Sequence, residues 1–244
     1  MADSFYLMYF LVFGVAFMYS SVGHGGASGY IAVMALFGLA PLEIRTNALL
    51  LNIAVASIAY LQFVRNTSTD WNLAKPLFIF SIPFAFIGGS ITLTESIFKY
   101  LLALILVLPV LRFSGLWRSE QQNFLAPKTW ILYLSGASIG LLSGMLGIGG
   151  GIILTPLLLW FGWTSTKQAA LISALFIVVN SIAGFIGLWN KNLTLPDSFF
   201  PLLITAVIGG ILGSFNGSTK FSNDVLKKLL ACVLCIAIYK LITI

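Results

Sequence analysis

Residues 19–29 read Tyr19-Ser20-Ser21-Val22-Gly23-His24-Gly25-Gly26-Ala27-Ser28-Gly29. These residues interrupt a long apolar run with small side chains, and they include the only histidine of the chain, His24. A second interruption follows half a chain later and reads Ser143-Gly144-Met145-Leu146-Gly147-Ile148-Gly149-Gly150-Gly151. Glycine-interrupted hydrophobic segments in corresponding positions of two halves are typical of the substrate site of membrane transporters. The pair of breaks therefore predicts a polytopic membrane transporter.

The composition excludes an ordinary soluble domain. The chain has 244 residues, of which 59% are hydrophobic and only 8% are charged, whereas a soluble domain carries roughly 25% charged residues. We therefore expect the lipid bilayer to be its solvent. The net charge of +6 is scattered over loops, so we expect no nucleic-acid partner. Cys232 and Cys235 have no further thiol and one distant histidine beside them, so we expect no metal and no cofactor.

Ten apolar segments predict an all-α membrane fold. They cover residues 5–21, 27–39, 46–64, 74–92, 98–113, 129–145, 151–163, 168–188, 198–215 and 225–241. A spanning helix needs about 20 residues, and segments 27–39 and 151–163 are too short. Each short segment directly follows a glycine break. Each break with its short helix is then either two crossings or a re-entrant hairpin, and the sequence leaves both open.

The order of landmarks predicts an internal duplication. Gly25-Gly26 matches Gly149-Gly150, and Phe37-Gly38 matches Phe161-Gly162, with three further matches in the same order. The predicted organisation is a first repeat over residues 1–113, a polar cytoplasmic linker over 114–128 and a second repeat over 129–244. Each repeat has a glycine-broken pair plus three spanning helices. Either crossing count is odd, so we expect the second repeat to be inverted.

The two breaks predict an anion site. Each short helix begins at glycines, and a helix start carries free N–H groups and about half a positive charge. Inversion would bring the two starts together near the middle of the membrane, where they could hold a small anion. No carboxylate falls in the middle of a segment, which disfavours a cation site. The expected substrate-binding residues are Gly23, His24, Gly25, Gly26, Ser28, Thr46, Asn47, Asn52, Gly147, Gly149, Gly150, Gly151, Ser173 and Asn180.

His24 and Arg45 are the two ionisable residues close to these features. His24 is expected to help hold an anion or to relay a proton, because an ionisable group inside a membrane is functional by default. Its counterpart in the second break is Ile148. Arg45 falls at the edge of segment 46–64, where an interfacial gate and an orientation charge are both plausible.

The chain resembles the TauE/SafE family of membrane permeases, a group of sulfite and organosulfonate exporters. The resemblance rests on Gly147-Ile148-Gly149-Gly150-Gly151-Ile152-Ile153-Leu154-Thr155-Pro156-Leu157-Leu158 and on Lys167-Gln168-Ala169-Ala170-Leu171-Ile172-Ser173-Ala174-Leu175-Phe176. The first break departs from the pattern, since it lacks the third glycine and the later proline. By resemblance, the substrate is a small sulfur oxyanion or sulfonate, such as sulfite, in an export permease.

Other function classes fit less well. A passive anion channel would use the same backbone sites, and a membrane scaffold or assembly factor is a third possibility. An enzyme is not expected. The Gly136-Ala137-Ser138-Ile139-Gly140 motif matches the G-x-S-x-G sequence of a nucleophile elbow but not its structure. An elbow lies on a turn between a strand and a helix, whereas Ser138 lies in a predicted helix. The ridge of Gly136, Gly140 and Gly144 is instead expected to allow close helix contact.

Basic residues divide the loops into two groups. One group holds Arg65, Lys75, Arg112, Arg118, Lys128, Lys167, Lys220, Lys227 and Lys228, and the other holds Arg45, Lys99, Lys191 and Lys240. The richer group is expected to be cytoplasmic. The chain is then a multi-pass protein of the cell inner membrane with both termini on the non-cytoplasmic side.

Cysteine labelling tests this orientation. Ala2→Cys and Ile244→Cys, each in a chain with Cys232 and Cys235 changed to serine, should react with a membrane-impermeant maleimide added to intact cells. A cysteine in place of Ser68 lies in the loop expected to be cytoplasmic and should stay unlabelled. Protection of both terminal cysteines would contradict the predicted orientation.

Overall fold

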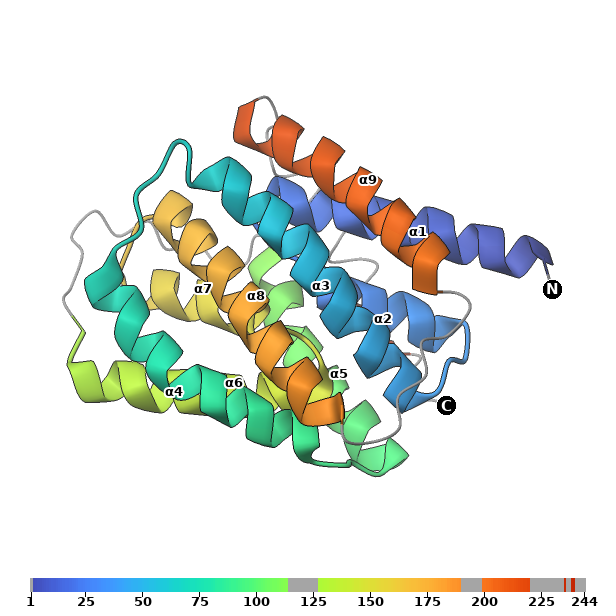
Figure 1. The fold of residues 1–244 in the computed structure, drawn as a ribbon, viewed down its shortest axis with the longest axis horizontal. Coiled ribbons are helices and arrows are strands. Elements are labelled where there is room, and N and C mark those ends of the chain that lie inside the picture. Colours follow the sequence, from blue (N-terminus) through green and yellow to red (C-terminus); the bar gives the residue numbers. More distant parts are fainter. Residues whose placement is uncertain (1, 114–126, 190–198, 220–234, 236–237, 240–244) are drawn as a thin grey trace.

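The computed structural model describes residues 2–113, 127–189, 199–219, 235 and 238–239. Within these ranges the regular structure is entirely α-helical (Figure 1). The helices are α1 Ala2–Ser21, α2 Ala27–Leu36, α3 Pro41–Phe63, α4 Trp71–Ser90, α5 Glu95–Phe113, α6 Thr129–Leu146, α7 Gly151–Trp160, α8 Thr166–Trp189 and α9 Phe199–Thr219. The linker 114–126 and almost all of the tenth predicted segment lie outside the described residues. The all-α class is confirmed.

Helices α1 and α6 end in the same way. Each is followed by a glycine with a left-handed backbone, Gly23 at φ +80° and Gly147 at φ +76°. A glycine in this conformation ends a helix and lets the next N–H reach back across the last turn. The bonds that do so correspond in the two breaks: His24 N–H to Tyr19 O at 2.9 Å, and Ile148 N–H to Ser143 O at 3.2 Å. The first break thus closes like the second despite its different sequence.

A second left-handed glycine precedes each short helix. Gly26, at φ +100°, precedes α2, and Gly150, at φ +78°, precedes α7. Both helices have ten residues, which is about 15 Å of rise and about half the thickness of the hydrocarbon core. The prediction of two short helices directly after the breaks is confirmed.

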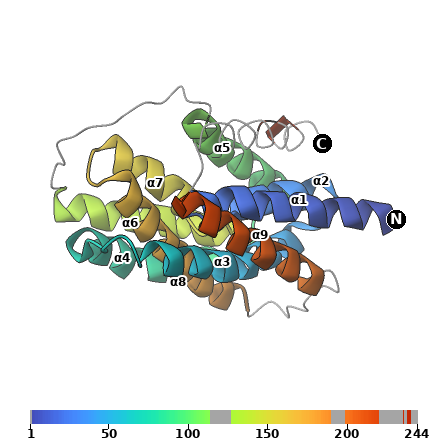
Figure 2. The ribbon, with the colours of Figure 1, turned by 90° about the horizontal axis from the view of Figure 1, so that it is seen from above.

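Helices of each half pack mainly against helices of the other half. Helix α4 packs against α6 and α8, while α9 packs against α1 and α3, and α3 packs against α8. Figure 2 shows α9 beside α1 and α4 beside α6. In Figure 1, α1 and α3 run from right to left, whereas α6 and α8 run from left to right. Two related halves would give this pairing, and the inverted duplication itself stays a prediction.

Glycines bring α4 and α6 into direct backbone contact. A Cβ atom on Gly136, Gly140 or Gly144 would collide with a main-chain carbonyl of α4: Leu77 O, Ser81 O and Ala85 O, respectively. The three glycines are four residues apart and therefore lie on one face of α6. Small residues of this kind allow close approach of helices in lipid. The predicted role of this ridge in helix packing is confirmed.

The outer surface is apolar, as a lipid-facing surface must be. Five described helices, α3, α4, α6, α8 and α9, are long and apolar enough to cross a membrane. On α9 the large exposed side chains follow a helical spacing and form one stripe: Phe200, Ile204, Ile208, Ile211, Leu212 and Phe215. A soluble monomer rarely exposes so much contiguous apolar surface. Together these features support a multi-pass membrane protein.

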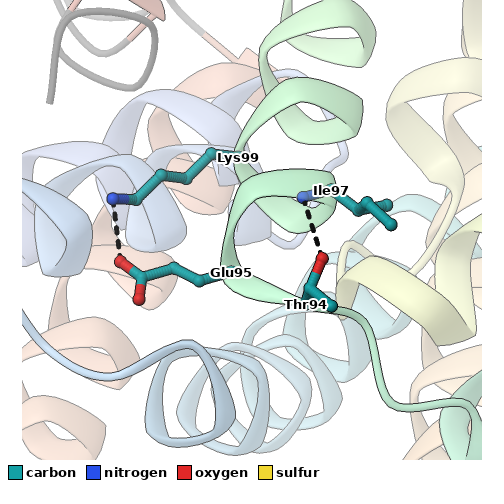
Figure 3. Close-up of polar contacts among 4 residues, drawn as sticks. All are labelled: Thr94, Glu95, Ile97 and Lys99. Carbon is teal, nitrogen blue, oxygen red and sulfur yellow. Dashed lines mark hydrogen bonds and ion pairs between the residues drawn. The ribbon is translucent and has the colours of Figure 1, made fainter.

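Exposed basic residues gather at one end of the bundle. The end of α3 and the starts of α4, α6 and α8 lie on the left of Figure 1, and they carry Arg65, Lys75, Lys128 and Lys167. The opposite end holds the start of α5, where Lys99 Nζ lies 2.8 Å from Glu95 Oε1 and Thr94 caps the helix through the N–H of Ile97 (Figure 3). The grouping agrees with the sequence, while the side of the membrane stays a prediction.

One expectation about charge was wrong. Arg45 is not a loop charge at a segment edge, because α3 begins earlier, at Pro41, and includes it. Proline is well suited to the first position of a helix, where its missing N–H costs nothing. Arg45 is 4% exposed, so it lies inside the protein and cannot be counted as an interfacial orientation charge.

Candidate functional site

The two breaks converge on the same pair of side chains. A Cβ atom on Gly25 would lie 2.5 Å from Asn52 Oδ1 and 3.2 Å from Ile177 Cγ2. A Cβ atom on Gly149 would lie 2.6 Å from Asn52 Nδ2 and 2.9 Å from Ile177 Cγ2. Asn52 comes from α3 and Ile177 from α8, the two helices that pack together at the centre. Only glycine leaves room for these contacts, so the backbone of both breaks lies directly against Asn52.

Asn52 has one end of its amide fixed. Its Oδ1 accepts a hydrogen bond of 3.0 Å from the N–H of Ala27, the first residue of α2. That bond satisfies one of the free donors of a helix start and leaves the donor end, Nδ2, facing Gly149. Nδ2 has no hydrogen-bond partner in the part of the chain that the structure describes, although Asn52 is fully buried.

Ser181 adds a second unpaired polar group at this point. Its Oγ would lie 2.9 Å from a Cβ atom on Gly149, and it too is fully buried and unpartnered among the described residues. A buried polar group without a partner costs about 1–3 kcal/mol, so such groups are rare and call for an explanation. A ligand that accepts hydrogen bonds at Gly149 would satisfy both.

His24 is joined to the second half by a chain of hydroxyls. Its Nδ1 lies 3.0 Å from Val22 O, its Nε2 lies 2.9 Å from Thr155 Oγ1, and that oxygen lies 2.7 Å from Ser173 Oγ. A carbonyl only accepts, so Nδ1 carries a proton. The hydroxyl of Thr155 has one hydrogen, which can go to Nε2 when the ring is neutral or to Ser173, the partner to which it donates in the structure. When the ring is protonated, Nε2 donates instead, and Thr155 can donate to Ser173. The direction of the chain can therefore follow the charge of His24.

The remaining glycines of the breaks pack against neighbouring helices. Gly23 faces Ala170 and Gly147 faces the backbone of Arg45. Gly26 faces the ring of Tyr30, Gly150 faces Phe176, and Gly151 faces Ile177. All of these glycines are buried. Their first role in the structure is to fit the breaks tightly against the surrounding helices, mainly α3 and α8, with Gly26 against α2.

Three of the expected polar residues have hydrogen bonds away from Asn52, and a fourth, Asn47, has none among the described residues. Ser28 Oγ lies 2.6 Å from the hydroxyl of Tyr19 in α1. Thr46 donates to Leu42 O in its own helix, and Asn180 Nδ2 donates to Phe176 O in its own helix. Asn47 is fully buried, with neither end of its amide paired among the described residues. The structure thus brings Asn52 and the glycines together, and it links His24 to Ser173, but it does not join Ser28 or Thr46 to them.

Sequence reasoning missed Thr155 and Ile177. Thr155 is a polar residue in an otherwise apolar ten-residue helix, which is a signal that could have been used. Ile177 carries no such signal, because an isoleucine in an apolar helix looks like any other packing residue. Its importance comes only from its position between the two breaks.

The serine of the nucleophile-elbow motif lies in ordinary helix. Ser138 is in the middle of α6 and is exposed on the outer surface. A nucleophile elbow needs a sharp turn between a strand and a helix. The surroundings of Ser138 therefore do not match that motif.

Comparison with known proteins gives two matches. A family profile described as Sulfite exporter TauE/SafE matches residues 8–241. The chain is also similar to the Probable membrane transporter protein y4hK of Sinorhizobium fredii (strain NBRC 101917 / NGR234). The two are 36% identical over 234 residues, which cover 94% of this chain and 95% of that protein. No solved structure matches the chain.

Asn52→Ala should destabilise the protein. The change removes the acceptor of the Ala27 N–H and leaves that buried donor unpaired, which costs about 1–3 kcal/mol. Ser57→Ala is the matched control on α3, because among the described residues the Ser57 hydroxyl bonds only to Ile53 O of its own helix. We expect this variant to stay within about 0.5 kcal/mol of the parent. Unfolding of the purified protein in detergent measures both, and equal stability of the two variants would contradict the bridging role of Asn52.

Proposed function

The chain belongs to the TauE/SafE family of membrane transporters, and we propose that it carries a small anion bound between its two glycine breaks. The proposed substrate is a sulfur oxyanion or an organosulfonate such as sulfite. The proposed location is the cell inner membrane, with both termini on the non-cytoplasmic side. The name of the family suggests the sulfur chemistry, whereas the proposed site rests on geometry.

One observation carries the proposal: both breaks meet the same amide. Asn52 accepts from the start of α2 with Oδ1 and directs Nδ2 toward the break before α7. A helix start carries about half a positive charge, and both short helices start here. Donors from two helix starts and one amide can hold an anion without a fixed charge.

The positions of the carboxylates support an anion over a cation. Among acidic residues whose side chains the structure describes, Glu43, Asp70 and Glu95 all lie at helix starts near the ends of the bundle. None contacts the breaks. A dehydrated cation bound at the breaks would need oxygen ligands there. The unpaired group at the breaks is instead Nδ2 of Asn52, which can only donate.

The proposed mechanism is alternating access. The anion binds at Asn52, and one repeat rocks against the other to expose it to either side, as in transporters built from repeats. A passive channel would bind the anion at the same place without this motion, and counterflow separates the two, because only a carrier exchanges labelled for unlabelled substrate.

Gly25→Ala and Gly149→Ala should each lower transport at least tenfold. The added Cβ would collide with Asn52 at the point where the anion is proposed to bind, and a small misplacement in a binding site can cost about a hundredfold. Gly14→Ala is the control, because a Cβ there meets no atom of the described residues within 4 Å.

Transport by the parent and each variant is measured with purified protein in liposomes. The substrates tested are sulfite, sulfate, thiosulfate, taurine, sulfoacetate and a carboxylate. If both variants transport like Gly14→Ala, the binding site lies elsewhere. If the parent protein carries none of the panel in either direction, the proposed substrate class is wrong.

His24 is proposed to couple transport to protons. Protonation reverses its chain of hydroxyls and adds a positive charge beside the breaks, so the anion should bind better as the pH falls. Histidine titrates between about pH 5 and 8. In the parent protein, the apparent KM should therefore decrease as the pH is lowered through this range. His24→Gln should remove that dependence, although glutamine can still accept or donate one hydrogen bond to Thr155. The same pH profile in the variant would show that His24 only has a structural role.

A further inference from the structure

Arg45 is a buried cation held by main-chain carbonyls. Its Nη1 donates to Ile91 O at 3.2 Å, and its Nη2 donates to Gly89 O at 3.2 Å, Gly144 O at 3.0 Å and, more weakly, Gly88 O at 3.5 Å. Three of these carbonyls belong to the end of α4 and one to the end of α6. Arg45 on α3 thus joins two helix ends that come from the two halves of the chain.

The charge of Arg45 is only partly balanced. The end of a helix carries about half a negative charge, and its last carbonyls have no partners within the helix. Those carbonyls therefore stabilise the guanidinium. In the part of the chain that the structure describes, the ion pair is Lys99 with Glu95, and no carboxylate faces Arg45. Its Nε has no partner there either, although the residue is 4% exposed.

The two halves differ at this point. Gly23 of the first break packs against Ala170 of α8, where a Cβ would lie 2.8 Å from the alanine Cβ. Gly147 of the second break instead meets the backbone of Arg45 in α3, where a Cβ would lie 3.1 Å from its Cα. The first break thus lies beside an alanine of α8, and the second lies beside an arginine of α3. Because Gly147 touches the Arg45 backbone, this packing does not need the charged side chain.

Arg45 and Asn52 lie on the same side of α3. Seven residues are close to two full helical turns, so the two side chains leave the helix in similar directions, about 10 Å apart along its axis. Both positions contact the second break, Arg45 at Gly147 and Asn52 at Gly149. Arg45 is the nearer of the two to the bundle end where α3 begins and α4 ends.

We propose that Arg45 is a second anion contact, which receives the substrate between the bundle end where α3 begins and the site at Asn52. The proposal rests on the proposed function, since it concerns the same substrate. Nε–H, the donor of Arg45 left without a partner among the described residues, would donate to one oxygen of an oxyanion as a charge-assisted hydrogen bond. The carbonyls of α4 and α6 hold the side chain in position, and the oxyanion supplies the counter-charge that they only partly provide.

Substitution of Arg45 tests the contact through KM. In liposomes, Arg45→Gln should raise the apparent KM for thiosulfate or sulfite at least tenfold, and Arg45→Lys, which keeps the charge but loses the planar fork, should raise it less. Arg65→Gln is the control, because Arg65 is an exposed arginine just past the other end of α3, and its KM should stay within twofold. Unchanged KM in folded Arg45→Gln would overturn the proposal, because a purely structural role lowers stability and not affinity.

A spectroscopic measurement covers the case in which Arg45→Gln does not fold. The chain has four arginines, Arg45, Arg65, Arg112 and Arg118, so changing the last three to lysine leaves Arg45 alone. The single Nε–H resonance of that variant in detergent should shift on addition of thiosulfate, with half of the shift near the KM of the same variant. Transport without any shift would overturn the Arg45 contact and leave the proposed function intact. No transport of any oxyanion by the parent protein would instead overturn the proposed function.

Discussion

The hydrogen bond from the N–H of Ala27 to the side chain of Asn52 is the contact on which the centre of this protein depends. Main-chain polar groups inside a bilayer must find partners within the protein, and each glycine break exposes several. Asn52 satisfies one of them from a neighbouring helix. Its amide also lies against Gly149 of the other break, so a single side chain ties both interruptions to α3. The breaks can exist at this depth because such partners surround them.

The breaks share a backbone and differ in chemistry. Both close with a left-handed glycine and the same main-chain bond, and both lead into a ten-residue helix. The side chains at and beside the breaks are different. The first break has His24 where the second has Ile148, and the first break lies beside Ala170 whereas the second lies beside Arg45. The two ionisable groups are therefore on opposite breaks.

Glycine also sets how the halves hold together. Without side chains at Gly136, Gly140 and Gly144, the carbonyls of α4 approach α6 directly, and van der Waals packing replaces a hydrophobic driving force that lipid does not supply. The same closeness places the carbonyls of Gly89 and Gly144 within reach of Arg45. Packing and electrostatics are thus coupled, since the helix ends that balance a buried charge are brought together by the residues that have no side chain.

The sequence by itself determined the membrane fold, the two breaks, the short helices that follow them and the glycine ridge, because each depends on local composition and spacing. It also identified Asn52, but only as one of several polar residues. Tertiary structure decided which of these meet: Thr155 lies beside His24 across 131 residues, and Ile177 completes the contact with Asn52. Arg45 shows the reason most clearly. The sequence placed it at the edge of segment 46–64, whereas its burial is stabilised by carbonyls 43 to 99 residues away. No local sequence pattern shows that these distant carbonyls will balance its charge.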